Sequence, residues 1–185
     1  MRRALALAVL VAALAAAPAH AAIPNCTGTA AKPSGFTCAE AVAYALDYPY
    51  ATESTSFLFV DGISYPYVRV TRNLTGDSTV RIAGKVITAR TLLARLGLTQ
   101  VARVPRTAFI AYGANRNPES LRRKFVLPGW RPHVIIPTLK ATLHDHAIVW
   151  APDIYAYGGL PSTMVPARGA TSEVWINWMD QATIS

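Results

Sequence analysis

The turn after Tyr112 carries residue types that could bind an acidic ligand. Gly113 and Ala114 leave the backbone of this turn almost bare, so that a ligand can contact the main chain. Asn117 has a side-chain oxygen that can cap a helix, and Pro118 suits the first helical position because it has no amide hydrogen to leave unpaired. A capped helix start with free N–H groups favours a carboxylate or another anion. An ordinary connection between a strand and a helix, without a ligand, is the alternative interpretation.

Two segments must position these residues. The first, residues 109–125 (FIAYGANRNPESLRRKF), predicts an apolar strand, a tight turn and a helix. The second, residues 157–180 (YGGLPSTMVPARGATSEVWINWMD), combines small residues with a threonine-containing strand and an aromatic strand. In this order the two segments resemble the YGSN-type loop and the VWG-type strand of the gamma-glutamylcyclotransferase-like superfamily, over less than half of the chain. Ala114 stands where the family has serine, so the hydroxyl is absent while the backbone amides remain.

The resemblance implies a small mixed β-barrel that cyclises a gamma-glutamyl amide to 5-oxoproline and releases an amine. Tyr112, Gly113, Ala114 and Asn115 would then bind the substrate, and no cofactor is implied. The family's catalytic glutamate lies on a helix after the VWG-type strand, which we expect to fall beyond Ser185, so that the catalytic residue stays unassigned and the core incomplete. A non-catalytic protein that binds small molecules through the same loop is an alternative function. A third possibility is a structural protein that interacts with the cell envelope through its N-terminal region.

The N-terminus has the pattern of a signal peptide. Two arginines precede an apolar run, residues 4–17, and Ala19-His20-Ala21 fits a signal-peptidase site. The run is shorter than the roughly 20 residues that cross a bilayer, which argues against a membrane anchor. We therefore expect an exported protein, periplasmic or secreted, whose mature chain begins at Ala22 and has no membrane segment.

The chain has two cysteines, Cys26 and Cys38. Because an exported protein meets an oxidising compartment, we predict a disulfide between them that closes the loop TGTAAKPSGFT. A loop of this size gives a nominal stabilisation of ~2 to 3 kcal/mol. A free or metal-binding pair is the alternative, although no nearby histidine completes a metal site.

Intact-mass measurement of the exported protein tests the leader and the disulfide together. Cleavage should leave Ala22 as the N-terminal residue, and reduction should add the mass of a hydrogen pair to the oxidised protein. A cytoplasmic protein with an uncleaved N-terminus would contradict both expectations.

Local signals predict a signal peptide in residues 1–21, an α+β extension in 22–106 and a β-rich core in 107–185. The signals in the extension are Thr37 before a first helix, Asp61-Gly62 and Gly84-Lys85 in two hairpin turns, and Thr88 and Gly97 at the ends of a second helix. The core contains the strand-like runs TAFIAYG, HVIIPTLKATL, HAIVWA, STMVPA and SEVWINW. No long linker separates the regions, so the extension should pack on the core. We therefore expect an α+β fold with a small mixed β-barrel.

The charge distribution does not favour a nucleic-acid site. The formal net charge is +8, and Arg122, Arg123 and Lys124 form a small basic cluster. The cluster lacks the interleaved aromatic residues that stack on bases, so we interpret it as the solvated face of a short helix. The basic excess predicts only a general attraction to anionic envelope polymers.

Few other residues could do chemistry. His144-Asp145-His146 places two imidazoles on one face of a strand, which can bind zinc, but no third ligand is identifiable and a turn before HAIVWA is favoured. Glu119 suits the dipole of a first helical turn without a catalytic role, and Glu173 should begin a strand and face solvent. No metal or cofactor is predicted, and the expected ligand is a small gamma-glutamyl molecule.

Overall fold

A computed structural model of the chain describes residues 52–129, 131–151 and 161–184. By its internal contacts the chain divides into two compact units, residues 1–40 and 41–185. Every described residue belongs to the second unit.

Three expectations lie outside the described residues. They are the cleaved leader, the disulfide between Cys26 and Cys38, and the helix that follows Thr37. None of the helices in the described ranges is long and apolar enough to cross a bilayer.

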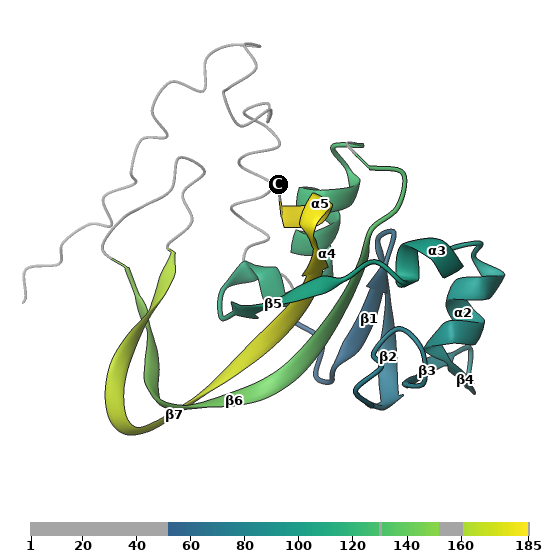
Figure 1. Cartoon of the computed structure of the whole chain (residues 1–185). Helices are drawn as coiled ribbons and strands as arrows, with labels where there is room; N and C mark the ends of the chain where they lie inside the picture. The colour runs from purple at the N-terminus through teal and green to yellow at the C-terminus, as the bar shows by residue number, and fades with distance from the viewer. Residues whose placement is uncertain (1–51, 130, 152–160, 185) are drawn as a thin grey trace, which may run out of the picture. The chain divides into compact units, whose positions relative to one another are not determined.

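Seven strands form one open sheet in the order β4-β3-β2-β1-β6-β7-β5 (Figure 1). The strands are β1 (Phe57–Val60), β2 (Ile63–Arg69), β3 (Thr79–Ile82), β4 (Lys85–Thr88), β5 (Arg106–Ala111), β6 (Ile135–Trp150) and β7 (Ser162–Asp180). The α+β class is confirmed. The expected mixed barrel is wrong, because each described strand pair is antiparallel and the edge strands β4 and β5 do not pair to close the sheet.

The sheet crosses the predicted boundary between extension and core. Strand β1 pairs with β6 in antiparallel register, from Phe57 opposite Thr138 to Val60 opposite Ile135. The residues assigned to the extension and to the core therefore share backbone hydrogen bonds within one sheet.

Both hairpins of the extension are present in the structure. Asp61 and Gly62 have φ of 47° and 96°, and two positive values in succession define the tight turn that matches the twist of paired strands. The second turn uses Ala83 and Gly84, with φ of 46° and 79°, one residue earlier than predicted. The shift has a simple cause, since Lys85 pairs with Ile82 and so already belongs to β4.

The described helices are short. They are α2 (Ala89–Arg95), α3 (Thr99–Ala102), the 3₁₀ turn η1 (Ala114–Arg116), α4 (Pro118–Leu121), the π-helical turn η2 (Arg122–Val126) and α5 (Gln181–Ile184). The predicted cap of the second helix is confirmed, because the Thr88 hydroxyl accepts a hydrogen bond from the Thr91 N–H at 3.1 Å. Gly97, with φ of 74°, follows its end.

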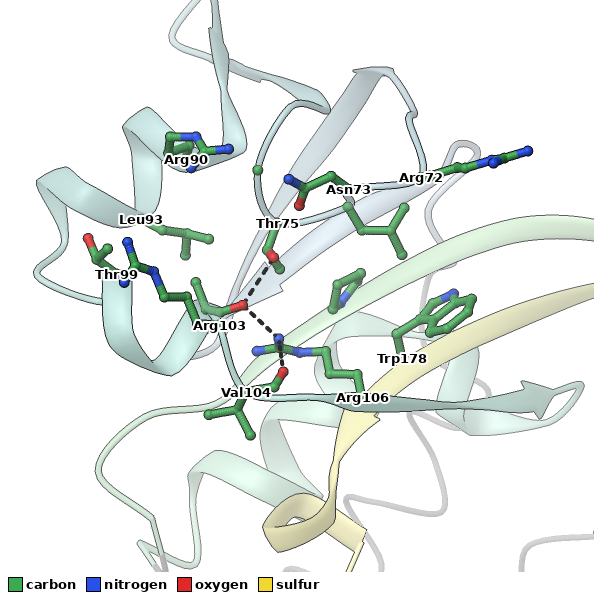
Figure 2. Close-up of a pocket in the computed structure, with 14 residues that line it drawn as sticks. Arg72, Asn73, Thr75, Arg90, Leu93, Thr99, Arg103, Val104, Arg106 and Trp178 are labelled. Atoms are coloured by element: carbon green, nitrogen blue, oxygen red, sulfur yellow. Dashed lines mark hydrogen bonds between the residues drawn. The ribbon is translucent and has the colours of Figure 1, made fainter.

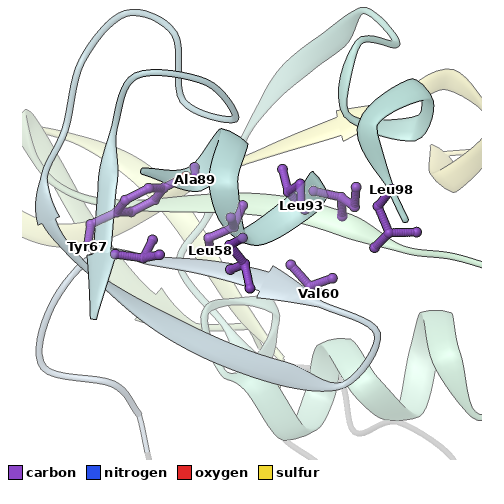
Figure 3. Packing of buried hydrophobic residues seen from close by; sticks show 9 residues of the cluster. Leu58, Val60, Tyr67, Ala89, Leu93 and Leu98 are labelled. Carbon is purple, nitrogen blue, oxygen red and sulfur yellow. The ribbon is translucent and has the colours of Figure 1, made fainter. Parts of the chain in front are cut away.

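Hydrophobic clusters cover both faces of the sheet. One contains Leu58 and Val60 of β1 with residues of α2 and the segment that follows it (Figure 3). The other contains Phe57 and Phe59 with Trp175 and part of α4. Alternate residues of β1 therefore enter different clusters, which explains why this central strand is a continuous apolar run instead of an alternating one.

The four strand-like runs after residue 133 form only two long strands, β6 and β7, which make a curved hairpin (Figure 1). The predicted turn at Asp145 is wrong, because it is a bulge inside the hairpin. Pairing shifts between His144 opposite Thr171 and His146 opposite Pro166. Asp145 has φ of 57°, and its carboxylate accepts a 2.8 Å hydrogen bond from the N–H of Gly169, where φ is 80°.

Candidate functional site

A cavity of about 320 Å³ lies beside the turn that opened the sequence argument. Tyr112, Gly113 and Ala114 line it from the end of β5 and the start of η1. The remaining wall residues come mainly from the β6–β7 hairpin and the start of α4; they are Thr52, Arg116, Asn117, Ile148, Val149, Trp150, Ser162, Ser172 and Glu173. The two segments singled out in the sequence therefore meet at one cavity.

Strand pairing and the hairpin bulge bring these walls together. β5 pairs with β7 as far as Ala111 opposite Trp175, so the chain that leaves β5 passes next to Glu173. Beyond the bulge, the distal part of the hairpin supplies Ser162 on the other side. A β-carbon at position 113 would lie 3.2 Å from the Ser162 Oγ, which is tighter than an ordinary contact.

Gly113 leaves space at this point of the cavity wall. A larger side chain would project toward Ser162 and narrow the cavity.

The predicted cap of α4 is confirmed and has a consequence for the expected anion site. The Asn117 Oδ1 accepts hydrogen bonds from the N–H groups of Glu119 at 2.8 Å and Ser120 at 3.2 Å. The chain itself thus occupies donors that a ligand would need, and α4 is only one turn long. In the described part of the chain, no hydrogen bond engages the N–H of Ala114, which leaves it as a donor on the cavity wall.

Asn115 anchors the loop and is not part of the cavity wall. Its backbone carbonyl accepts a 2.8 Å hydrogen bond from Asn177 Nδ2, and its side-chain oxygen accepts one from Lys124 Nζ. Asn177 is 1% exposed and lies in β7 between Trp175 and Met179. Because side chains alternate along a strand, these three residues share one face of the sheet. The sequence argument overlooked Asn177, although an amide among inward-facing apolar residues signals a specific buried partner.

Glu119 is held as an ion by two arginines. Its carboxylate accepts hydrogen bonds from Arg122 Nε at 2.7 Å and Nη2 at 2.8 Å, and from Arg123 Nε at 2.7 Å. The hydrogen bonds from Arg122, and then those from Arg123, outweigh the effect of partial burial and lower the pKa of Glu119 to about 2. A carboxylate so stabilised is a poor proton acceptor near neutral pH, which agrees with a structural role.

Glu173 occupies a different environment. It lies in the interior of β7 instead of at its start, lines the cavity, and forms a 2.7 Å ion pair with Lys140 Nζ. Its side chain is 51% exposed, so it contacts both solvent and the cavity. Among the described residues of the wall it is the one carboxylate. The sequence indicated the solvent contact, but only strand pairing places Glu173 beside the Tyr112 turn.

The two histidines of the bulge do not form part of a recognisable metal centre. His146 Nδ1 lies 3.0 Å from the carbonyl of His144, and the bulge interrupts the alternation that would align both rings. Within the described ranges, no group of three or more His, Cys, Asp or Glu side chains is close enough to hold a metal ion.

Comparison with protein-family models, curated proteins and solved structures gave no match to this chain. The cavity and the two sequence segments that meet at it are the features of this chain that point to a function. The described wall offers a backbone donor, several side-chain hydroxyls, the Asn117 amide, the guanidinium of Arg116 and the carboxylate of Glu173 around a space of ligand size.

Proposed function

We propose that this chain is an exported gamma-glutamylcyclotransferase-like protein whose cavity binds a gamma-glutamyl amide and cyclises it to 5-oxoproline. One observation carries the proposal: the bare backbone of Tyr112 to Ala114 and the carboxylate of Glu173 line the same cavity. The export and the family assignment rest on the sequence patterns. The cavity adds a carboxylate within the same space as the substrate-binding turn.

The reaction needs three contributions from the protein. The α-amine of the glutamyl group attacks its own γ-carbonyl carbon, the bond to the leaving nitrogen breaks, and the proton lost by the amine passes to the leaving amine. A cavity wall that folds the glutamyl chain brings the amine close to the carbonyl. The Ala114 N–H can donate to the oxygen that becomes negative, and Glu173 can carry the proton.

Glu173 suits this role better than Glu119. Among the described residues Glu173 has one cationic partner, Lys140, in an ion pair that solvent screens. Glu119 has two arginine partners and a pKa of about 2, so it is nearly always deprotonated and holds a proton weakly. Glu119 also does not line the cavity.

A non-catalytic binding protein is the second candidate, and the same ion pair favours it. Lys140 already engages the Glu173 carboxylate at 2.7 Å, and a carboxylate that stays paired cannot accept a proton from a substrate amine. In that case the cavity binds the gamma-glutamyl group and releases it unchanged.

Replacement of Glu173 by Gln separates the two candidates. For the enzyme, 5-oxoproline release from a gamma-glutamyl dipeptide, followed by mass spectrometry, should fall by about 10²- to 10⁴-fold. Calorimetric affinity for the dipeptide should change little, because glutamine keeps the size of the side chain. Binding without turnover by the unaltered chain would establish the binding protein. An equal loss in Glu119→Gln, with Glu173→Gln active, would contradict the role given to Glu173.

Two further variants test the position of the site. Gly113→Val should block binding, because its side chain would project toward Ser162. Asn115→Ala should weaken binding to a smaller extent, since it loses the contact with Lys124 but keeps the carbonyl that Asn177 holds. If both variants are folded and bind the dipeptide as the unaltered chain does, the site lies elsewhere.

A further inference from the structure

A second cavity, of about 360 Å³, shares no described wall residue with the first (Figure 2). It lies between the loop before β3 and the helices α2 and α3. Four arginines line it, Arg72, Arg90, Arg103 and Arg106, and its described wall contains no carboxylate. Protein surfaces ordinarily intersperse charges of both signs, so four cations around one space require an explanation.

The loop that forms one wall is held in a single conformation by local hydrogen bonds. The carbonyl of Asn73 accepts hydrogen bonds from the N–H groups of Gly76 at 3.2 Å, Asp77 at 3.1 Å and Ser78 at 3.3 Å. Thr75 Oγ1 donates to the carbonyl of Ala102 at 3.1 Å, which ties the loop to the end of α3 across the cavity (Figure 2). The loop is therefore already ordered, and it would lose little conformational entropy when a ligand binds.

Arg106 and Arg90 contribute charge, and both already form hydrogen bonds to other groups of the protein. Arg106 Nη1 donates to the carbonyls of Ala102 at 3.0 Å and Val104 at 2.9 Å, beneath the cavity. Arg90 pairs with Asp77 at 3.0 Å. Burial lowers the pKa of Arg106, yet a guanidinium stays protonated throughout the physiological range.

Arg72 and Arg103 keep their donors available. Within the described ranges, neither guanidinium takes part in a hydrogen bond or an ion pair. Arg103 lies on the helical side of the cavity, whereas Arg72 extends outward from the loop side and, being exposed, can change rotamer toward a ligand (Figure 2). In the conformation shown, the Arg72 guanidinium points away from the cavity, so a contact with a bound anion requires a change of its rotamer.

We propose that this cavity binds a phosphate-bearing anion with more than one negative charge. Guanidinium groups donate paired hydrogen bonds to phosphoryl oxygens, and among the described residues neither Arg72 nor Arg103 has a carboxylate partner. Four arginines on one cavity wall, with no carboxylate among its described residues, favour a ligand with more than one negative charge over a singly charged one. Leu93, Pro137 and Trp178 add apolar wall, which reduces the competition from water.

Calorimetric titration of the full chain with inorganic pyrophosphate tests the proposal. Inorganic phosphate, which has one phosphoryl group instead of two, is the comparison. Pyrophosphate should bind more tightly than phosphate. Arg103→Gln should weaken pyrophosphate binding by about tenfold, and the additional change Arg72→Gln should weaken it further. Arg81→Gln is the matched control, because it removes the same charge from β3, outside the cavity wall. It should change the affinity by less than about twofold.

Vesicles distinguish a free phosphate compound from a lipid headgroup as the source of the phosphoryl group. Sedimentation with phosphatidylglycerol vesicles, but not with phosphatidylcholine vesicles, and its loss in the double variant would assign the site to a lipid headgroup. Pyrophosphate binding without sedimentation would assign it to a soluble compound. An equal effect of Arg81→Gln and Arg103→Gln, or no binding in either assay, would overturn the proposal.

Discussion

Replacing Asp180 by Asn should lower the free energy of unfolding by about 3 kcal/mol, because it breaks a buried ion pair from one side. Asp180 is 2% exposed, and its Oδ1 accepts hydrogen bonds from Arg131 Nη1 at 2.6 Å and from both the N–H and the hydroxyl of Thr183 at 2.8 Å. These bonds fix the start of α5 and the segment before β6. Urea unfolding at pH 7, followed by circular dichroism, measures the loss.

The same carboxylate should make the free energy of unfolding depend on pH. Burial alone raises the pKa of Asp180, but the hydrogen bonds from Arg131 and Thr183 outweigh it and leave the pKa below its ordinary value. Its contribution is therefore complete above pH ~4 and is lost as the pH falls through the lowered value. Glu119 acts in the same direction, so the difference between Asp180→Asn and the unaltered chain isolates the Asp180 part.

Asp77→Asn is the matched control for the buried pair. It removes one carboxylate of an ion pair whose two side chains are each 62% exposed, so water replaces the lost partner and no measurable change is expected. If Asp180→Asn lowers the free energy of unfolding no more than this control does, the hydrogen bonds of Asp180 to Arg131 and Thr183 contribute nothing to stability.

Replacing Trp175 by Ala should cost about 3 to 5 kcal/mol of unfolding free energy. Trp175 is fully buried and packs at 5.7 Å between ring centroids against Phe57, with Lys140 Nζ 6.0 Å above its ring. Its indole N–H is buried without a partner among the described residues. Trp175→Phe should therefore cost much less, because phenylalanine retains an aromatic ring and removes the unpaired donor.

Trp150→Ala provides the comparison for Trp175. Trp150 is 67% exposed, so its loss should change stability by less than about 0.5 kcal/mol, although it lines the first cavity. Denaturant midpoints of the three tryptophan variants give the order. A stability loss in Trp175→Ala no larger than in Trp150→Ala would contradict the assignment of Trp175 to the core.

Features that depend on neighbouring residues were predictable from the sequence. The turn at Asp61-Gly62 needs two positive φ values in succession, and few residue pairs supply them as readily. The caps at Thr88 and Asn117 likewise require one side chain and an N–H two or three residues later. Local rules of this kind hold wherever the segment sits in the fold.

Features that depend on the pairing of distant segments were not predictable from the sequence. The open sheet, the fusion of four runs into β6 and β7, and the position of Glu173 all follow from which strands pair and in what register. The sequence predicts a solvent-facing Glu173 at the start of a strand, and half of its side chain is exposed. Only the pairing of β5 with β7 brings it to the Tyr112 turn. Asn177 was missed for the same reason, since its partner at Asn115 lies on another element.

The bulge in the β6–β7 hairpin makes the first cavity sensitive to the number of residues in one segment more than to their identity. Asp145 alone stands opposite residues 167–170 of β7. Side chains along a strand alternate between faces, so adding or deleting one residue in 167–170 should exchange the faces of the distal hairpin and carry Ser162 away from Gly113. Related chains that keep the cavity should therefore keep Gly169, whose φ is 80°, and should tolerate substitution at its neighbours in this segment. They should not tolerate single-residue insertions or deletions there.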